Sequence, residues 1–357
     1  RFEVSDLFCR PTDQQTIQLT TYPYRLPLKS PFRITHGSRT EQPTIIVKLV
    51  AEDGYYGLGE APMTSYYGLR TEECLAILEK VAEALLSYTD LAPAEVHAFL
   101  DRDFPNIHPF LRCALDVAAH DLWAKRQGKR LGSCWNQPSP DQRVPTTYTI
   151  SLGTPAEMAE KVAASPWPLY KIKLGTDRDI EIIQALRRVT TAPFRVDANT
   201  GWTVEQTLHY APLLQKMGVE FIEQPLPTND WTGYRKLYQE SPLPIMADES
   251  CQSEEDVERC VEHFHGINIK IVKCGGLLPA RRMVQKARSY GLEVMAGCMT
   301  ESSVGISAIA QLVPELDYVD IDGALLLAND PAEGVGFDDL GVVQFPNRPG
   351  TGALLKN

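Results

Sequence analysis

Apolar and polar positions repeat eight times along residues 144–325. Each repeat holds a short apolar run typical of a buried strand, and gaps such as 177–190, 203–217 and 279–290 show helical spacing. Thr203 followed by Gln206 forms a capping box that marks one helix start. Strands that alternate with helices in this way predict a parallel (β/α)8 TIM barrel over residues 143–330. The predicted strands are 147–150, 169–174, 194–197, 220–223, 244–248, 267–273, 292–296 and 318–322.

A different pattern covers residues 16–142. Alternating segments at 16–21 and 44–50 are followed by 55–60, and the Asp53-Gly54 turn predicts that the last two form a hairpin. Helical spacing then appears over 71–86, 93–102 and 108–127, which predicts an α+β domain. We expect residues 331–357, rich in Gly and Pro, to pack back on this domain. Residues 1–15 are predicted to be an N-terminal extension.

The composition excludes several classes of protein. With 357 residues and 43% hydrophobic content, the chain is long enough for one large and one smaller domain. Its net charge of −11 and the lack of a basic stripe disfavour nucleic-acid binding. No apolar run approaches the ~20 residues of a membrane span. We therefore expect a small-molecule partner rather than nucleic acid or a membrane.

The cysteines bear on the cellular compartment. Eight are scattered along the chain without a Cys-x-x-Cys pair, so neither a zinc cage nor a redox motif is indicated. A domain of this size needs no disulfides, which favours free, buried thiols in a reducing compartment. We expect a cytoplasmic protein. Export to the periplasm would follow instead if residues 1–15 remain from a cleaved signal.

Polar residues gather where the predicted strands end. The active site of a barrel lies at the carboxyl ends of its strands, so these positions are the candidate functional residues. In chain order they are Thr149, Lys171 with Lys173, Asp197 with Asn199, Glu223, Asp248 with Glu249, Lys273, Cys298, and Asp320 with Asp322. Strands rich in Val, Ile and Leu would not end in polar residues so consistently by chance.

Asp197, Glu223 and Asp248 end three consecutive predicted strands. Consecutive barrel strands are neighbours, so these carboxylates should converge, and they repel one another unless a cation lies among them. Oxygen ligands without His or Cys favour Mg²⁺, with Mn²⁺ as the alternative. The competing interpretation is that the three acids pair with Arg or Lys of the barrel.

Three lysines complete the predicted chemistry. Lys171 and Lys173 share one face of a strand, and Lys273 ends a predicted strand on the opposite side of the ring. A lysine beside another lysine and a dication loses proton affinity, which suits a general base. One lysine would remove the proton next to a substrate carboxylate and the other would return one to the opposite face. The alternative is that the lysines lie on surface loops.

Five motifs in this order resemble the muconate-lactonizing subgroup of the enolase superfamily. They are Lys171-Ile-Lys173, Asp197-Ala-Asn199, Ile222-Glu223-Gln-Pro225, Ala247-Asp248-Glu249-Ser250 and Lys273-Cys-Gly-Gly276. The resemblance implies an N-terminal capping domain and metal binding by Asp197, Glu223 and Asp248. It implies acid/base roles for Lys173 and Lys273, with Lys171 tuning Lys173. Homo-oligomers are common in the superfamily, so self-association is a further expectation.

Asp320 and Asp322 distinguish between activities within this subgroup. Two carboxylates on one strand face suit an ammonium group, and the pair resembles the feature with which dipeptide epimerases hold a free amino terminus. We expect a dipeptide epimerase, acting on L-Ala-D/L-Glu from peptidoglycan. The alternatives are o-succinylbenzoate synthase, muconate cycloisomerase and N-succinylamino acid racemase, whose substrates lack the ammonium. A barrel that binds without turnover would not need the lysines.

The remaining candidate residues would shape the substrate site. The run from Pro31 to Arg39 resembles the mobile capping loop of such epimerases, and Arg33 or Arg39 would meet a second substrate carboxylate. Thr149 and Cys298 are candidates for substrate contact. Cys298 stands where the mandelate-racemase-like branch has a catalytic His, so that branch is disfavoured.

Overall fold

The computed structural model describes residues 16–34, 37–90, 92–135 and 144–356, and its larger part is a ring of eight parallel strands. Each strand pairs with the next along the chain, and a parallel bridge from Thr146 to Val319 joins the two ends of the sheet. The TIM-barrel prediction is therefore confirmed. The strands are β4 Tyr148–Ile150, β5 Tyr170–Lys173, β6 Phe194–Asp197, β7 Val219–Glu223, β8 Ile245–Ala247, β9 Gly266–Ile269, β10 Glu293–Gly297 and β11 Tyr318–Asp320.

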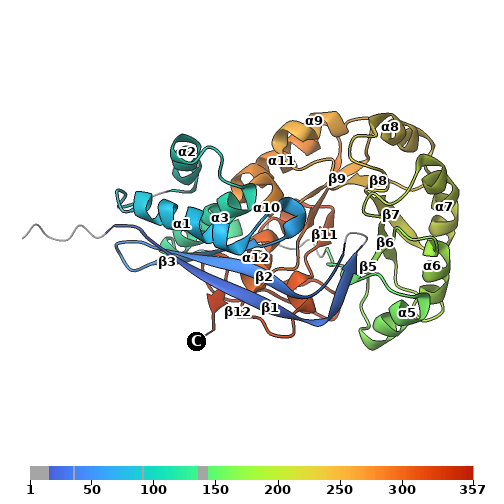
Figure 1. Cartoon of the computed structure of the whole chain (residues 1–357), viewed down its shortest axis with the longest axis horizontal. Helices are drawn as coiled ribbons and strands as arrows, with labels where there is room; N and C mark the ends of the chain where they lie inside the picture. The colour runs from blue at the N-terminus through green and yellow to red at the C-terminus, as the bar shows by residue number, and fades with distance from the viewer. Residues whose placement is uncertain (1–15, 35–36, 91, 136–143, 357) are drawn as a thin grey trace, which may run out of the picture.

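Helices α5 to α9 cover the outside of the ring (Figure 1). At the start of α7, Thr203 Oγ1 accepts from Gln206 N (3.2 Å), while Thr203 N donates to Gln206 Oε1 (2.9 Å). The predicted capping box is therefore present. The helices of this domain are α5 Pro155–Ala164, α6 Asp179–Arg187, α7 Val204–Lys216, α8 Trp231–Glu240, η2 Glu254–Asp256, α9 Val257–Cys260, α10 Ile271–Cys274, α11 Leu277–Ser289, α12 Ser303–Ala310, η3 Val313–Glu315 and η4 Gly323–Leu326.

The predicted strand 267–273 was wrong in its extent. The run 267–273 was expected to be a single strand ending at Lys273, but β9 stops at Ile269 and Lys273 lies in the short helix α10. The chain turns because Lys270 O accepts from Lys273 N (2.9 Å), and because Gly275 (φ 92°) ends the helix in a left-handed conformation. The residue at the strand end is therefore Lys270.

The N-terminal domain has a three-stranded antiparallel sheet: β1 Gln18–Ile34, β2 Gly37–Val50 and β3 Tyr56–Pro62. The β2–β3 hairpin was predicted. The segment 31–39 was expected to be a loop, but on either side of residues 35–36 it continues the strands, since Phe32 pairs with Arg39 and Arg33 with Ser38. A register shift after Pro27 bends this β1–β2 arm toward the barrel (Figure 1).

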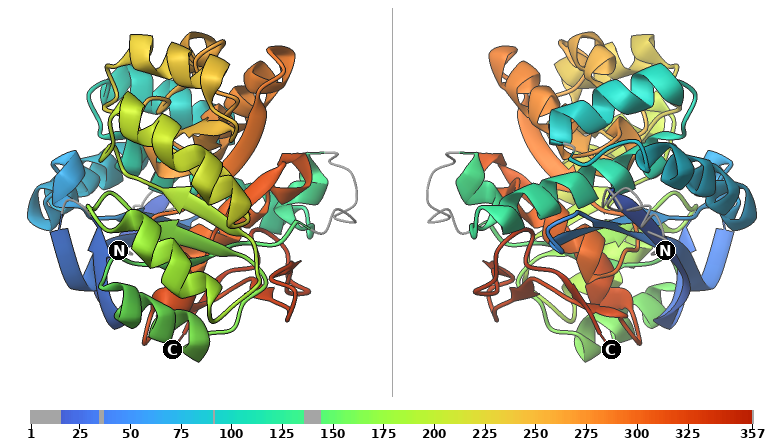
Figure 2. Two further views of the ribbon diagram at one scale, coloured as in Figure 1. Left: turned by 90° about the vertical axis from the view of Figure 1, so that its right-hand side faces the viewer. Right: turned by 90° about the vertical axis from the view of Figure 1, so that its left-hand side faces the viewer.

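Helices η1 Ser65–Tyr67, α1 Thr71–Leu85, α2 Pro93–Asp103, α3 Pro109–Arg126 and α4 Leu131–Cys134 complete this domain. Helix α3 packs directly on β3, because Gly57 and Gly59 have no side chains there. A Cβ at Gly57 would lie 1.9 Å from the Ala118 carbonyl oxygen, and one at Gly59 would lie 1.9 Å from that of Ala114. The two views of Figure 2 show this sheet (blue) and its helices lying together against the barrel domain.

The C-terminal segment contacts the N-terminal domain. Its short strands are β12 Ala332–Glu333, β13 Gly336–Phe337, β14 Val343–Gln344 and β15 Leu354–Leu355. Ala332 and Ala353 join a small apolar cluster with Ile46 and Leu58 of the sheet. Thr351 N donates to Asp121 Oδ1 on α3 (2.7 Å). These contacts hold the C-terminal segment against the N-terminal domain.

Two predictions from composition, on the cysteines and on membrane spans, can be compared with the structure for the described residues. Seven cysteines there are free thiols, and Cys9 lies outside them. None of the described helices is both long and apolar enough to cross a membrane. The predicted extension 1–15 also lies outside the described residues.

Candidate active site

A cavity of about 770 Å³, counting the part open to solvent, lies at the carboxyl ends of the barrel strands beneath the β1–β2 arm. The barrel contributes Thr149, Lys171, Lys173, Asn199, Glu249, Lys270, Cys298, Met299, Thr300, Asp320, Asp322 and Leu326. The N-terminal domain contributes Phe32, Arg39, Thr64, Tyr66 and Tyr67. The cavity is therefore built by both domains, and the N-terminal one caps it.

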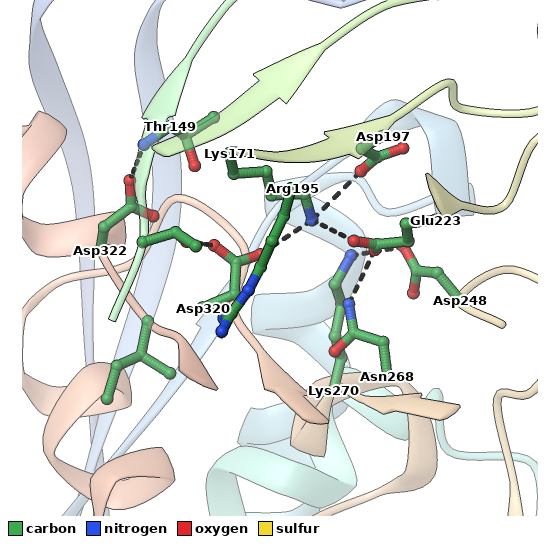
Figure 3. A network of polar contacts seen from close by, with 12 residues as sticks. Thr149, Lys171, Arg195, Asp197, Glu223, Asp248, Asn268, Lys270, Asp320 and Asp322 are labelled. Atoms are coloured by element: carbon green, nitrogen blue, oxygen red, sulfur yellow. Dashed lines mark hydrogen bonds and ion pairs between the residues drawn. The ribbon is translucent and has the colours of Figure 1, made fainter. Parts of the chain in front are cut away.

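The three predicted metal ligands lie together below the cavity. Asp197 and Glu223 end β6 and β7, Asp248 follows β8, and all three are buried. Lys171 joins two of them, since its Nζ lies 3.1 Å from Asp197 Oδ2 and 2.7 Å from Glu223 Oε2. Figure 3 shows this ammonium between the two acids and Asp320, whose Oδ2 it also contacts (2.8 Å).

Lys173 and Lys270 line the cavity from opposite sides of the barrel. Lys173 Nζ donates to Asp197 Oδ2 and Lys270 Nζ to Asp248 Oδ2, both at 2.7 Å. Lys273 Nζ donates to the other oxygen of Asp248 (2.7 Å), but its side chain is only 1% exposed and does not line the cavity. The structure thus brings Lys171 and Lys173 to the cavity as expected, with Lys270 facing them.

Sequence reasoning missed Lys270 although a signal was present. In a strand, residues 268 and 270 share one face, and a residue three further along points to the other face. If Asn268 and Lys270 point into the barrel, Lys273 on the same strand would point out of it. The alternation alone therefore allowed Lys270, rather than Lys273, to be the inward-facing lysine. Thr300, which the motifs also left aside, accepts a hydrogen bond from Arg39 (2.9 Å).

The charges in this cluster perturb one another strongly. Burial opposes ionisation of Asp197, but Lys173 and Lys171 lower its pKa to about 2. Burial raises the pKa of Glu223 to about 7, although Lys171 opposes the shift. Burial disfavours the charged form of Lys171, yet Asp320, Glu223 and Asp197 raise its pKa well above the ordinary value. The ionisation of each of these groups therefore depends on its burial and on its charged neighbours.

A count of charges supports a divalent cation. The acids of the cluster are Asp197, Glu223, Asp248, Glu249, Asp320 and Asp322, against the lysines Lys171, Lys173, Lys270 and Lys273. Asn199 Oδ1, Glu249 Oε2 and Asn268 Oδ1 are buried oxygens without hydrogen-bond partners. Within the described ranges, no three Asp, Glu, His or Cys side chains already form a metal site, since ammonium groups separate the acids. The oxygen-rich donor set nevertheless fits Mg²⁺.

Asp320 ends β11, whereas Asp322, which was predicted on the same strand, lies just after it at the start of η4, and the two acids have different partners. Asp320 is bound by Lys171 and by the Thr147 hydroxyl, whereas Asp322 Oδ2 accepts from Thr149 N (2.6 Å). Burial and the neighbouring Asp320 raise the pKa of Asp322 to about 7. Both acids line the cavity, so a cation that enters would be attracted to them.

Of the two candidate arginines, only Arg39 reaches the cavity. Its side chain lies over the Phe32 ring (5.2 Å), no carboxylate of the described residues lies within ion-pair distance, and burial lowers its pKa. Arg33 is half-exposed and lies 3.9 Å from Glu157, outside this cavity. Cys298 lines the cavity as expected, and burial raises the pKa of its thiol.

Comparison with known proteins agrees with this arrangement. Residues 16–133 match the mandelate racemase / muconate lactonizing enzyme N-terminal domain, and residues 154–357 match the enolase C-terminal domain-like family. The chain belongs to the enolase superfamily. The sequence-based recognition of this superfamily is thereby confirmed.

Relatives of this enolase-superfamily protein carry related names. An L-Ala-D/L-amino acid epimerase of Flavobacterium johnsoniae is 47% identical, over 93% of this chain and 98% of the relative. The L-Ala-D/L-Glu epimerase of Escherichia coli is 34% identical, over 87% and 94%. A crystal structure of a dipeptide epimerase from Cytophaga hutchinsonii with Mg and D-Ala-L-Val has a TM-score of 0.88 at 26% identity, covering 96% of both chains. This member of the superfamily is therefore an isomerase.

Proposed function

We propose that this protein is a dipeptide epimerase that inverts the α-carbon of the C-terminal residue. The observation that carries the proposal is the arrangement of one cavity, with a lysine on each side and two buried carboxylates at one end. We further propose L-Ala-D/L-Glu and similar L-Ala dipeptides from peptidoglycan as substrates. The names of the relatives from Flavobacterium johnsoniae and Escherichia coli support this choice.

Two lysines would move the proton. Lys173 and Lys270 come from β5 and the end of β9, four strands apart in a ring of eight, so they approach a substrate from opposite faces. The lysine that is a free amine takes the α-proton, and the ammonium of the other gives a proton to the opposite face. We assign this second role to Lys270 in place of Lys273, because a side chain that does not line the cavity cannot reach the substrate.

The acids beneath the cavity would control the charge that develops. Asp197, Glu223 and Asp248 would hold Mg²⁺, or Mn²⁺ in its place, and the bound ion would stabilise negative charge on the substrate carboxylate as the α-proton leaves. Lys171 forms ion pairs with Asp197, Glu223 and Asp320. It would therefore fix the positions of two metal-binding acids relative to an acid that binds the substrate ammonium.

The two ends of the dipeptide have matching groups. Asp320 and Asp322 would bind the free amino terminus, and Arg39 would bind a second carboxylate, as in a C-terminal glutamate. The substrates of a succinylbenzoate synthase, a muconate cycloisomerase or an N-succinylamino acid racemase carry no ammonium. They would give Asp322, which has no ion pair with a lysine or arginine of the described residues, no ammonium to bind, so these alternatives are not favoured.

Proton exchange tests the proposal directly. The protein is incubated with Mg²⁺ and a set of dipeptides in deuterated water, and mass spectrometry and chiral analysis follow the products. We expect deuterium at the α-carbon of the C-terminal residue together with loss of optical purity, and no loss of optical purity in a Lys173→Ala variant that still folds. Turnover of a succinylbenzoate precursor or muconate, without exchange in any dipeptide, would contradict it.

A further inference from the structure

A second cavity lies beside the active site, between the β1–β2 arm, β4 and α5. It is lined by Leu28, Lys29, Ser30, Phe32, Tyr148, Thr149, Ile150, Ser151, Lys161, Ala164, Ser165 and Leu326. Phe32, Thr149 and Leu326 also line the active-site cavity, so these three side chains form the boundary between the two spaces. A ligand that fills the first cavity therefore meets the second one across this boundary.

The second cavity is positive in a protein whose net charge is −11. Its lining contains Lys29 and Lys161 and no Asp or Glu. Lys161 is half-buried and its Nζ donates to Ser151 Oγ (2.9 Å), while no described carboxylate lies within 4.0 Å of it. Burial and the nearby Arg33 lower the pKa of Lys161, and Glu157 opposes this. An ammonium that lines a cavity without Asp or Glu in its lining favours an anionic group there.

The position of Thr149 relates this charge to the substrate. Thr149 N donates to Asp322, one of the two acids proposed to hold the amino terminus, and its side chain faces both cavities. In a dipeptide, the ammonium and the first side chain are attached to the same α-carbon. A substrate anchored at Asp322 thus places its first side chain next to the boundary formed by Thr149, Phe32 and Leu326.

We propose that the second cavity is a subsite for the side chain of the N-terminal residue and that Lys161 binds a carboxylate there. The enzyme then accepts dipeptides that begin with Asp or Glu in addition to those that begin with Ala. This inference rests on the proposed epimerase function, because it uses the ammonium site to orient the substrate. It concerns the first residue, whereas the chemistry takes place at the second.

The test compares three dipeptides that differ only in the first residue: L-Ala-L-Leu, L-Gln-L-Leu and L-Glu-L-Leu. Gln and Glu side chains have the same length, so a difference in kcat/KM between these two dipeptides reports the effect of the side-chain charge. With Mg²⁺ present, we expect kcat/KM for the Glu-first dipeptide to exceed that for the Gln-first dipeptide about tenfold, as for a charge-assisted hydrogen bond in a partly buried site. Lys161→Met should abolish this ratio.

Two further variants complete the experiment. Lys236→Met makes the same change on the exposed face of α8 and should leave the ratio unaltered. Ala164→Glu, at an exposed position that lines the second cavity, should invert the ratio, and it tests the proposal independently of whether the Lys161 variant folds. Exchange of the Ala-first dipeptide without a Glu-over-Gln preference would overturn this inference alone. Exchange of no dipeptide would overturn the proposed function as well.

Discussion

At the scale of single residues, the separation between Lys270 and Lys273 decides how the proton would move. Both ammonium groups contact Asp248, one on each oxygen at 2.7 Å, so charge alone does not distinguish them. Only Lys270 lines the cavity. A base must reach the atom that it deprotonates, which makes access the deciding property.

We expect Lys173→Ala and Lys270→Ala each to lower epimerisation by about 10²- to 10⁴-fold, the usual contribution of a general base. Each variant should still exchange the α-proton of one C-terminal enantiomer, because the other lysine remains on its own face. The measurement is deuterium incorporation into L,L and L,D dipeptides separately. Lys273→Ala should slow both enantiomers alike; selective loss for one of them would restore Lys273 as the second base.

The amino-terminal site gives a second residue-scale prediction. Asp322→Asn removes the acid that accepts a hydrogen bond from Thr149 N, so we expect KM for L-Ala dipeptides to rise by about tenfold or more while kcat changes less. N-acetylated dipeptides lack the ammonium and should be unaffected by the substitution. Equal loss for free and acetylated dipeptides would show that Asp322 has only a structural role.

At the scale of elements, helix α3 lies on β3 because glycines alternate along that strand. We expect Gly57→Ala to destabilise the protein by about 1–3 kcal/mol, since its Cβ would overlap the Ala118 carbonyl. Gly336→Ala is the matched control, because a Cβ there meets no atom within 4 Å and its φ is not positive. Thermal unfolding checks both; a control that is as unstable as Gly57→Ala would indicate that the close packing is not the cause.

The junction between β3 and α12 predicts a pH dependence. Glu60 accepts from Ser302 N (3.0 Å) and Gly305 N (3.0 Å), and the nearby Glu301 is also buried. Burial, and secondarily Glu60, raise the pKa of Glu301 to about 8. A pKa raised above its unfolded value means that the folded state binds the proton more tightly. Protonated Glu301 therefore contributes its full stabilisation of the folded state below about pH 4, and this contribution is lost as the pH rises through about 8.

We expect Glu301→Gln, which cannot ionise, to raise the melting temperature relative to the wild type at pH 8.5 and to change it little at pH 5. The Gln side chain keeps an oxygen to accept from Met299 N. Melting curves of both proteins across this pH range make the comparison. A difference that is independent of pH would contradict the assignment to Glu301.

At the scale of the whole molecule, the proposed metal site joins three neighbouring strands of the barrel. Binding of Mg²⁺ to the folded state alone would stabilise it by about 2.7 kcal/mol at a hundred times the dissociation constant. We expect a rise in melting temperature of about 4 °C, saturable in Mg²⁺ and lost on addition of EDTA. In Glu223→Gln the rise should be much smaller. An equal rise in this variant would place the cation elsewhere, and the readout does not depend on activity.

Much of this architecture could be predicted from the chain alone. The eight-strand period, the hairpin after Asp53-Gly54 and the capping box at Thr203 depend on residues close in sequence, so local propensity is sufficient to predict them. The sequence also predicted that Asp197, Glu223 and Asp248 converge, because consecutive strands of a barrel are neighbours. The sequence thus determined the barrel, the lysine pair on β5 and the family.

Only the tertiary structure decided which groups share a space. Strand β9 ends early because the chain turns into α10, which packs against α3, and no local pattern indicates that contact. The register of the β1–β2 arm brings Arg39 to the cavity and leaves Arg33 outside it. Arg39 is 261 residues away in sequence from Thr300, to which it donates a hydrogen bond. Lys161 faces a cavity formed by three distant segments. Such long-range contacts depend on the packing of the whole chain, so local sequence does not encode them.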